Sequence, residues 1–461
     1  MTTLKNWNHA IVYEVADGQY KSPTEISEVQ EIVKHAYQND MPVTVAGSRH
    51  STTACMVGSG INLSMQNFDR ILSVDKGNRT ATVQAGVTLS KLGSHLRQMG
   101  LQPPLVLEWG NYHIGAISGT HANDTETGRA AQFSSYVLGV KLVTPTGELM
   151  EISGNHNAEY LPAIRSHFGM FGVIYEVTLE VRENRPLSIT FMKVNLDDFL
   201  DNFHEEIQSL KINYDHVFGM LCPQSGKLYW QGRKFIEQEK TSRHFLSTWK
   251  NRVGAKNALF KIALSLIRAT SPVSCSATRA KVLSIAFVGL PMAIVKHIPY
   301  VINPCDRGKL YEEKDARLDF YDWVFPEKNW VGMARSFLQL SYKFRKDHNF
   351  GLPLPALIYF IPKDQASLLS RSRDANMMAI DPLYPYPEDT TWKEFRLEFN
   401  KIAMLHGGIP HINKTRDGAV YCFGKAIDPA VMHLFLKQRA HFDPKNLFLN
   451  DHFREMFAEY L

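Results

Sequence analysis

Cysteine is scarce in this 461-residue sequence, and its placement excludes the usual cysteine-based frameworks. The five cysteines are scattered along the chain, and no two of them form a C-x-x-C pair. Such a distribution is typical neither of a disulfide scaffold nor of a zinc site, and it fits a reducing compartment. We therefore expect a cytoplasmic protein without a metal centre.

The sequence also lacks a long apolar run and a large excess of charge of one sign. Its start, MTTLKNWNHAIVYEV, has no apolar stretch behind a basic one, so a secretory signal is not expected. The best membrane candidate, VLSIAFVGLPMAIV at 282–295, contains Pro291 and is too short for a confident span. A net charge of +5 is small for this length, and no nucleic-acid-binding motif is present. We expect no nucleic-acid partner.

Strand and helix patterns alternate through the first 183 residues. The segment SPTEISEVQEIVKHAYQND has apolar residues at helical spacing, and we expect Thr24 to cap that helix. A strand at 43–46 follows, then TATVQAG as a half-buried strand, then a helix capped by Thr88 with Leu92 and Leu96 inward. No G-x-G-x-x-G follows any of these strands, which disfavours a nicotinamide site.

The composition of the sequence changes near residue 184, where aromatic and basic residues become more frequent. An amphipathic stripe at 259–267 has Lys256, Lys261 and Arg268 beside it. A helix of this kind packs on a core in most soluble proteins, and the alternative is a helix on a membrane surface. We carry both interpretations for the segment 255–301.

Four segments contain the residues suited to chemistry. In AGSRHS at 46–51, Gly47 allows a ligand to approach the backbone, and the two serines add hydroxyl donors. Hydrogen bonds to a charged phosphate are worth about 1.5–3 kcal/mol each, so such a loop can hold a pyrophosphate. A phosphate cradle does not need an imidazole, however, and His50 requires another explanation.

The other three segments are polar or rich in glycine. WGNYHIGAISGTHANDTETG at 109–128 carries hydroxyls and two histidines, His113 and His121, without the ligand spacing of a metal site. The glycines of GMFGVI at 169–174 again allow a ligand to approach the backbone closely. HGGIPHINK at 406–414 puts His411 and Lys414 three residues apart.

Taken in order, VAGSRHS, AGVTLSKL, IGAISGTH, FGMFGVI and DPKNLFLNDHFREMF resemble the vanillyl-alcohol-oxidase-type (PCMH) flavoproteins, in particular the aldonolactone and alditol oxidases. The resemblance implies a two-domain α+β fold: a FAD-binding domain at 1–183, a substrate (cap) domain at 184–405 and a C-terminal segment at 406–461 that returns to the flavin. In that family the histidine of the G-x-x-H-S loop is bonded to the 8α carbon of FAD, so the resemblance makes His50 the attachment point.

The resemblance also transfers individual roles to this chain. Hydride transfer from a CH–OH group to FAD is implied, with oxygen or another electron acceptor, and His411, Lys414 and Tyr359 are the catalytic candidates. The implied cofactor-binding residues are Ala46, Gly47, Ser48, Arg49, His50, Ser51, Gly115, Ser118, Gly119, Thr120, His121, Gly172, Ile174 and Asn450.

Three departures from the family pattern bear on function. The glycines that usually follow the T-H pair are replaced in Ala122-Asn123-Asp124, which leaves oxidase and dehydrogenase both open. The strand that carries a Glu-x-Arg pair in sugar-lactone enzymes has Leu357 and Tyr359 instead, and Ile412 replaces a tryptophan. We therefore expect a substrate less polar than a sugar lactone. The alternatives are an aldonolactone or alditol oxidase proper, a membrane-surface flavin dehydrogenase, and a binding protein that has lost catalysis.

Overall fold

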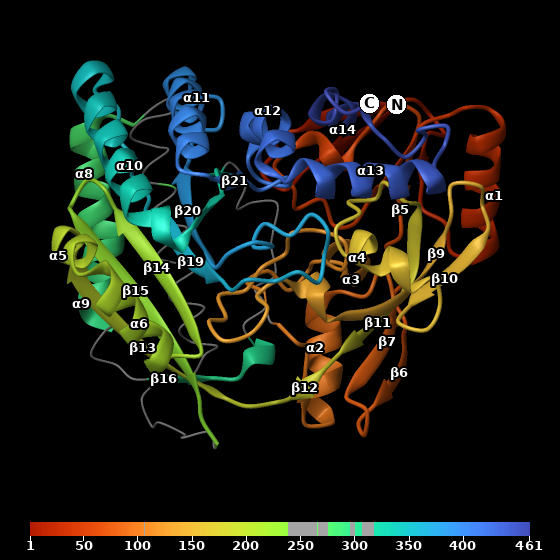
Figure 1. Cartoon of the computed structure of the whole chain (residues 1–461), viewed down its shortest axis with the longest axis horizontal. Coiled ribbons are helices and arrows are strands. Elements are labelled where there is room, and N and C mark those ends of the chain that lie inside the picture. Colours follow the sequence, from red (N-terminus) through yellow and green to blue (C-terminus); the bar gives the residue numbers. More distant parts are fainter. Residues whose placement is uncertain (106, 238–264, 266–274, 296–299, 307–317) are drawn as a thin grey trace.

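The computed structural model describes residues 1–461 except 106, 238–264, 266–274, 296–299 and 307–317. Within this part of the chain, two large hydrophobic cores lie beside each other, each built from both helices and strands. Figure 1 shows the core of the N-terminal elements on the right and that of the middle of the chain on the left. The predicted α+β architecture is confirmed.

Two small sheets form the first core. Three parallel strands lie in the order β3 (Tyr20–Lys21), β5 (Ile61–Ser64), β4 (Val43–Ala46). Five antiparallel strands lie in the order β10 (Leu149–Ser153), β9 (Val137–Val143), β11 (Val173–Glu180), β7 (Thr80–Gln84), β6 (Ile71–Asp75). Two short pairs accompany them: β1 (Thr2–Lys5) with β2 (Val12–Val15), and β8 (Leu101–Gln102) with β12 (Arg182–Glu183). The helical elements are α1 (Ile26–Gln38), η1 (Ala54–Met56), α2 (Leu89–Gln98), α3 (Ile114–Ile117), η2 (Phe133–Tyr136), η3 (Ala158–Tyr160) and α4 (Leu161–Ile164).

Local sequence patterns explain the helices of this part. The Thr88 hydroxyl accepts from the Lys91 N–H at 3.2 Å and caps α2, as predicted. For α1 the prediction was wrong by one residue: the cap is Glu25, not Thr24. The carboxylate of Glu28, one turn into the helix, accepts from the Thr24 N–H at 2.7 Å. A carboxylate there also suits the positive end of the helix dipole.

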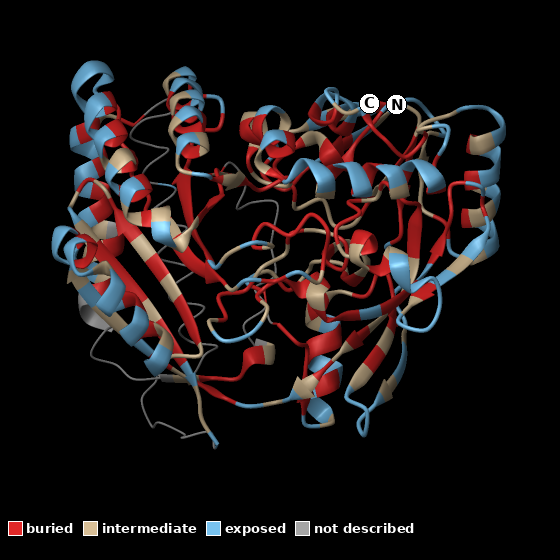
Figure 2. Cartoon of the chain, in the orientation of Figure 1, coloured by how far each residue is buried: buried red, intermediate tan, exposed pale blue. Residues whose placement is uncertain are grey.

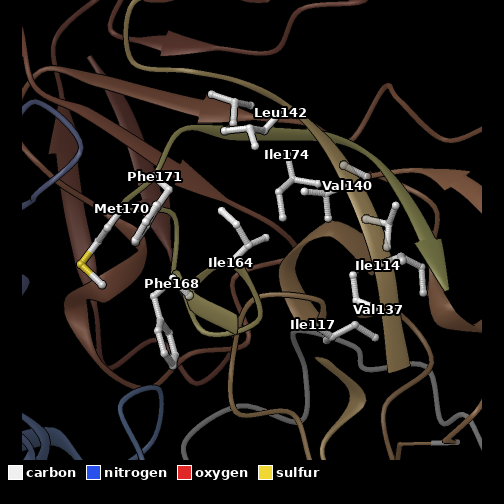
Figure 3. Close-up of a cluster of buried hydrophobic side chains, with 14 of the residues drawn as sticks. Ile114, Ile117, Val137, Val140, Leu142, Ile164, Phe168, Met170, Phe171 and Ile174 are labelled. Atoms are coloured by element: carbon white, nitrogen blue, oxygen red, sulfur yellow. The ribbon is translucent and has the colours of Figure 1, made fainter. Parts of the chain in front are cut away.

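Hydrophobic packing fixes the short helix α3 against the five-stranded sheet. Figure 3 shows Ile114 and Ile117 of α3 close to Val137 and Val140 of β9. All four side chains are buried, and burying an aliphatic side chain of this size contributes about 1.5–3 kcal/mol. This packing fixes α3, and the loop that begins at its end lines the candidate site described below.

A nine-stranded sheet forms the second core. Its path runs β16 (Tyr300–Ile302), β13 (Leu187–Asn195), β15 (Lys227–Phe235), β14 (His216–Cys222), β19 (Ala356–Ile361), β20 (Met377–Tyr384), β18 (Trp323–Pro326), β21 (Ile409–Pro410), and β17 (Asp319–Phe320) pairs with β20. The accompanying helical elements are α5 (Leu196–Asp201), α6 (Phe203–Asn213), α8 (Ala277–Ser284), η5 (Ile285–Gly289), α9 (Leu290–Val295), η6 (Pro304–Asp306), α10 (Glu327–His348) and α11 (Thr390–Leu405). Figure 2 shows α10 and α11 exposed on their outer faces, while β20 is buried along its whole length.

The last three helices return to the first core. They are α12 (Arg416–Ala426), α13 (Pro429–Phe442) and α14 (Asp451–Met456). Phe423, Phe435 and Phe453 are buried in the same cluster as Val33 and Leu63 from the start of the chain. Figure 1 shows α13 and α14 lying across the N-terminal elements. The first core thus needs residues from both ends of the sequence.

The segment predicted to contact either a core or a membrane is only partly described. Its stripe at 259–267 lies outside the described residues apart from Ser265. Residues 282–295 are helical, in α8, η5 and α9, with Val282 and Leu290 exposed. In the described ranges no single helix has the length and apolarity to cross a membrane, and only the sharply bent pair α12–α13 meets both conditions together.

Candidate active site

A large cavity lies between the two cores. Its walls come from the loops after β4 and α3, from strands β14, β15, β19 and β20, and from the segment after β21. It encloses about 1860 Å3, counting space open to solvent.

Most of the residues singled out from the sequence line this cavity. They are Ala46, Gly47, Ser48, Arg49, His50, Ser51, Gly115, Gly119, Thr120, His121, Gly172, Ile174, Tyr359, His411 and Lys414.

Two predicted cofactor contacts, Ser118 and Asn450, lie behind the wall instead. Ser118 is fully buried beneath it. Asn450 caps α14, and its side-chain amide donates to the carbonyls of Cys55 and Val57 at 3.0 and 3.2 Å. These bonds hold the η1 turn next to the His50 loop.

The loop at 46–51 turns sharply beneath the cavity. Arg49 has a φ of 53°, in the left-handed region that L-residues rarely adopt. The His50 ring lies edge-on to Tyr112 with ring centroids 4.6 Å apart, and its Nδ1 is 2.8 Å from the Ser48 hydroxyl. Burial lowers the pKa of His50 to about 4, so the imidazole is neutral at physiological pH. A neutral imidazole keeps a lone pair, which makes it a nucleophile.

Two glycines allow the cavity loops to pack closely. A Cβ on Gly47 would lie 2.7 Å from the Cβ of Ala116 on α3. A Cβ on Gly119 would lie 2.2 Å from Cδ2 of the buried His167 ring. Real Cβ atoms do not approach other heavy atoms this closely, so both positions require glycine for reasons of space.

Hydrogen bonds join the His50 loop to the segment after β21. The Asn413 carbonyl accepts from the Thr52 N–H at 2.7 Å and from the Ser51 hydroxyl at 2.9 Å. The hydroxyls of Thr52 and Thr53 donate to the carbonyls of Lys414 and Ile412, each at 2.8 Å. Two motifs about 360 residues apart in the sequence are thereby held against each other. This explains why both line one cavity.

A buried cluster of charges stands behind the cavity wall around Asp322. Its carboxylate accepts from Arg371 Nη1 at 3.1 Å, from Lys414 Nζ at 3.2 Å and from the Tyr359 hydroxyl. Asp322 and Arg371 are both fully buried. Burial alone would raise the pKa of Asp322, but the charges of Arg371 and Lys414 together hold it well below its usual range. The cluster is therefore an ionised pair with further donors, not a set of neutral groups.

His411 is held as a neutral histidine by the backbone. Its Nδ1 accepts from the Asn413 N–H at 3.1 Å, so Nε2 carries the proton and donates to the His121 carbonyl at 2.8 Å. Burial, with the nearby Arg371, keeps the pKa of His411 well below its usual range. Both ring nitrogens are thus occupied by main-chain groups. The arrangement ties the 411–414 segment to the loop after α3.

Asp381 places a carboxylate on the cavity wall. It lies on β20 directly opposite Leu357 of β19, and its Oδ2 is 3.5 Å from Lys414 Nζ. The side chain is fully buried, and its Oδ1 has no hydrogen-bond partner among the described residues. Burial raises the pKa of Asp381, although Lys414 opposes the shift.

These positions correct the predicted lining of the pocket. Ile412 is fully buried in the first core and does not line the cavity. Leu357 does line it, but Asp381 is its cross-strand neighbour and lines it as well. The cavity wall thus also carries charged groups, which come from neighbouring strands rather than from β19. The polarity of the substrate itself stays a prediction.

The segment Ala122-Asn123-Asp124, which departs from the family pattern, connects the two cores. All three residues line the cavity, and Asp124 Oδ1 is 3.9 Å from Arg233 Nη1 on β15. The Asp124 carboxylate is also 3.6 Å from the ring of His216 on β14. An acidic residue in this loop thus pairs with the second core. Among the described residues, no three histidine, cysteine or acidic side chains are placed to hold a metal.

Comparison with known proteins gives consistent results. Residues 19–153 match the model of a FAD binding domain. The L-gulonolactone oxidase of Mus musculus is 25% identical over 465 residues, which covers 98% of both chains. The mitochondrial L-galactono-1,4-lactone dehydrogenase of Brassica oleracea is 27% identical over 216 residues, 47% of this chain and 35% of that protein. A cholesterol oxidase of B. sterolicum superposes with a TM-score of 0.77 at 14% identity, over 98% of this chain and 96% of the other.

The cavity fits FAD on the chemistry of its lining. Arg49 and the Gly47–Ser51 backbone offer a positive charge and N–H donors to a pyrophosphate. Buried polar atoms on the wall have no hydrogen-bond partner in the described ranges, among them Arg49 Nε, His113 Nδ1 and Asn413 Oδ1. Such atoms are costly unless a ligand or water completes them. A flavin with its phosphates supplies both donors and acceptors.

The sequence analysis missed Asp322, Arg371 and Asp381. Asp381 stands alone in the apolar strand MMAIDPLY, and Asp322 lies with Asp319 in the otherwise apolar segment DFYDWVF. A lone carboxylate in an otherwise buried strand must have a partner, and that was the available signal. The identity of the partner was not available, since Arg371 comes from the loop between β19 and β20.

Proposed function

We propose that this chain, which is a FAD-linked oxidoreductase of the aldonolactone oxidase and dehydrogenase type with a PCMH-type fold, oxidises a CH–OH group of a polyhydroxylated lactone or alditol. The main support is that Asp381, Lys414 and Tyr359 line the same cavity as the His50 loop. Each hydroxyl left unpaired on burial costs about 1–3 kcal/mol, so a substrate rich in hydroxyls needs such a wall.

Bound FAD supplies the acceptor for a hydride from the carbinol carbon. Lys414 and Tyr359 are then polar partners for the reacting hydroxyl. Burial would lower the pKa of Lys414, but Asp381 and Asp322 raise it, so Lys414 is a cationic donor. Its ammonium orients an oxygen and favours negative charge there as the hydroxyl proton departs. His411 positions this segment through its two backbone contacts.

FAD is attached through His50 in this proposal. The neutral ring lies in the loop suited to the cofactor, with Ser48 and Tyr112 fixing its orientation. A bond from a ring nitrogen of His50 to the methyl carbon at flavin position 8 would remove two protons and two electrons in total, and the flavin itself, followed by oxygen, would be the oxidant. The tether prevents loss of the cofactor from an open cavity.

Oxygen is the proposed acceptor in turnover, since the mouse relative that matches over 98% of both chains is named an oxidase. The loop at 122–124 lines the cavity. Substitutions in this loop would therefore change the access of oxygen to the flavin. The partners are thus a small-molecule alcohol and oxygen.

A second candidate is a less polar alcohol, as the sequence analysis predicted. Trp109, Phe218, Phe320 and Leu357 also line the cavity and offer it apolar surface. This wall suits either the carbon face of a sugar ring or a more extended hydrophobic substrate.

The test is anaerobic titration of the oxidised holoenzyme with aldonolactones, alditols and apolar secondary alcohols, cholesterol among them. Bleaching of the flavin spectrum reports reduction. We expect a lactone or alditol to bleach it, and Lys414→Met to slow the bleaching about 100-fold or more. Lys425→Met, in a surface pair with Glu459, is the matched control and should react like the wild type. Bleaching by apolar alcohols alone contradicts the proposed substrate class.

A further inference from the structure

We propose that Asp381 is the group that accepts the hydroxyl proton of the substrate. The inference rests on the proposed oxidation of a carbinol and adds the residue that completes its proton balance. The carboxylate reaches the cavity from β20, on the wall it shares with Lys414 and Tyr359.

Asp381 has the geometry of a base prepared for a ligand. The side chain is fully buried, and one oxygen, Oδ2, faces Lys414 Nζ at 3.5 Å. The other oxygen, Oδ1, makes no hydrogen bond of ordinary geometry in the described ranges, although the Tyr321 main chain lies near the carboxylate and the residue lines the cavity. A buried carboxylate oxygen without a donor is costly, and a substrate hydroxyl would remove that cost.

The neighbouring groups cannot take the proton. His411 uses both ring nitrogens on the main chain, and Lys414 is already protonated between two carboxylates. Tyr359 is protonated, and its hydroxyl donates a hydrogen bond to Asp322. Asp322 accepts from three side chains and does not line the cavity. Asp124 lines the cavity but lies against Arg233, His216 and its neighbour's N–H.

The reaction balances with these groups. The O–H bond of the carbinol breaks and its proton passes to Asp381 Oδ1. The C–H bond breaks and the hydrogen leaves with its electron pair to oxidised FAD, while a C=O bond forms. The substrate loses two electrons, FAD gains them, and Asp381 later returns the proton to water. Lys414 remains beside the reacting oxygen as the cation.

The surroundings of Asp381 give the pH dependence its sign. Lys414, Asp322 and Tyr359 face it from three other elements, and Arg371 lies behind Asp322. The base must be ionised to act, so flavin reduction should accelerate with pH and then level off. Because burial raises the pKa of Asp381, the midpoint should lie above the ordinary value of about 3.9. Lys414→Met removes the stabilising cation and should move the midpoint to higher pH.

The experiment compares wild type, Asp381→Asn and Asp389→Asn as holoenzymes in anaerobic stopped flow across pH. Asp389 is a buried carboxylate in the same core that caps α11 and accepts from Tyr384, away from the cavity. We expect Asp381→Asn to slow flavin reduction 10²–10⁴-fold and to abolish its rise with pH. Substrate affinity, read from spectral perturbation, should change less than tenfold, and Asp389→Asn should match the wild type.

The outcomes separate this inference from the proposed function. If Asp381→Asn reduces its flavin within threefold of wild type and with the same pH profile, Asp381 is not the base. If only an apolar alcohol bleaches the wild type, the substrate class is wrong, and the same comparison run with that alcohol still decides the role of Asp381. If light reduces the flavin but no carbinol does, the proposed oxidation and the proposed role of Asp381 are both wrong.

Discussion

Removing the charge of Asp322 should destabilise the protein severely. Asp322→Asn keeps the size of the side chain but leaves Arg371 and Lys414 with only Asp381 as a buried counter-charge. Breaking a buried ion pair by removing one partner typically costs 3–5 kcal/mol, because the remaining charge stays out of water. The Tyr359 hydroxyl and Lys414 also lose a charged acceptor at Asp322, so we expect a loss of about 4 kcal/mol.

Urea unfolding followed by tryptophan fluorescence measures this loss, since Trp230, Trp323, Trp330 and Trp392 are buried in the same core. The pKa of Asp322 is lowered in the folded state, so its stabilisation is complete above the unfolded value of about 3.9 and is lost as pH falls through the folded value. The stabilisation that Asp322 itself contributes should thus be lost only below about pH 4.

Two comparisons make the prediction refutable. Asp201→Asn removes a carboxylate that pairs with Arg335 at the surface, and it should change stability by less than about 0.5 kcal/mol. Adding Arg371→Gln to Asp322→Asn restores the charge balance, so the double variant should be about 0.5–3 kcal/mol more stable than the sum of the single effects. A loss below about 1 kcal/mol for Asp322→Asn, or strict additivity, would refute the account of this cluster.

Three further predictions concern the cavity loops. Wild-type protein should stay yellow after acid precipitation, whereas His50→Ala should release its flavin to the supernatant; a colourless wild-type pellet from flavin-replete protein contradicts the tether. Photoreduced enzyme should reoxidise in air-saturated buffer within about a second in stopped flow, and reoxidation over many seconds with rapid dye turnover would make it a dehydrogenase. Gly119→Ala should lower stability by about 1–3 kcal/mol in urea, because its Cβ meets His167, while Gly128→Ala, with open space around it, should change stability little.

Features encoded within a few residues of sequence could be predicted well. Helix α2, with Thr88 as its cap and Leu92 and Leu96 inward, follows from spacing and capping alone. The glycine-rich loops were predicted to let a ligand approach the backbone, and Gly47 and Gly119 instead pack closely against Ala116 and His167, while the ligand contact stays a prediction. The one-residue error at Glu25 arose because a Glu cap is less common than a Thr cap.

Features that depend on strand pairing could not be predicted. The chemistry of the wall opposite Leu357 is set by Asp381, 24 residues later in the numbering, and only the sheet register brings the two together. Ile412 was assigned to the pocket because it lies beside His411, yet the turn directs it into the first core. Contacts between Lys414 and Asp322 span 92 residues, and no local pattern indicates such a pair.

The return of α12–α14 to the first core has a consequence for how the protein is made. A ribosome completes Val33 and Leu63 long before it reaches Phe423, Phe435 and Phe453, which pack with them. Until then, the nascent N-terminal part exposes the apolar surface that those helices will cover. The His50 loop likewise lacks its partners at Ile412, Asn413 and Lys414 during most of synthesis. Closure of the cavity is thus a late, long-range event in biosynthesis, and nascent chains should depend on chaperones until translation ends.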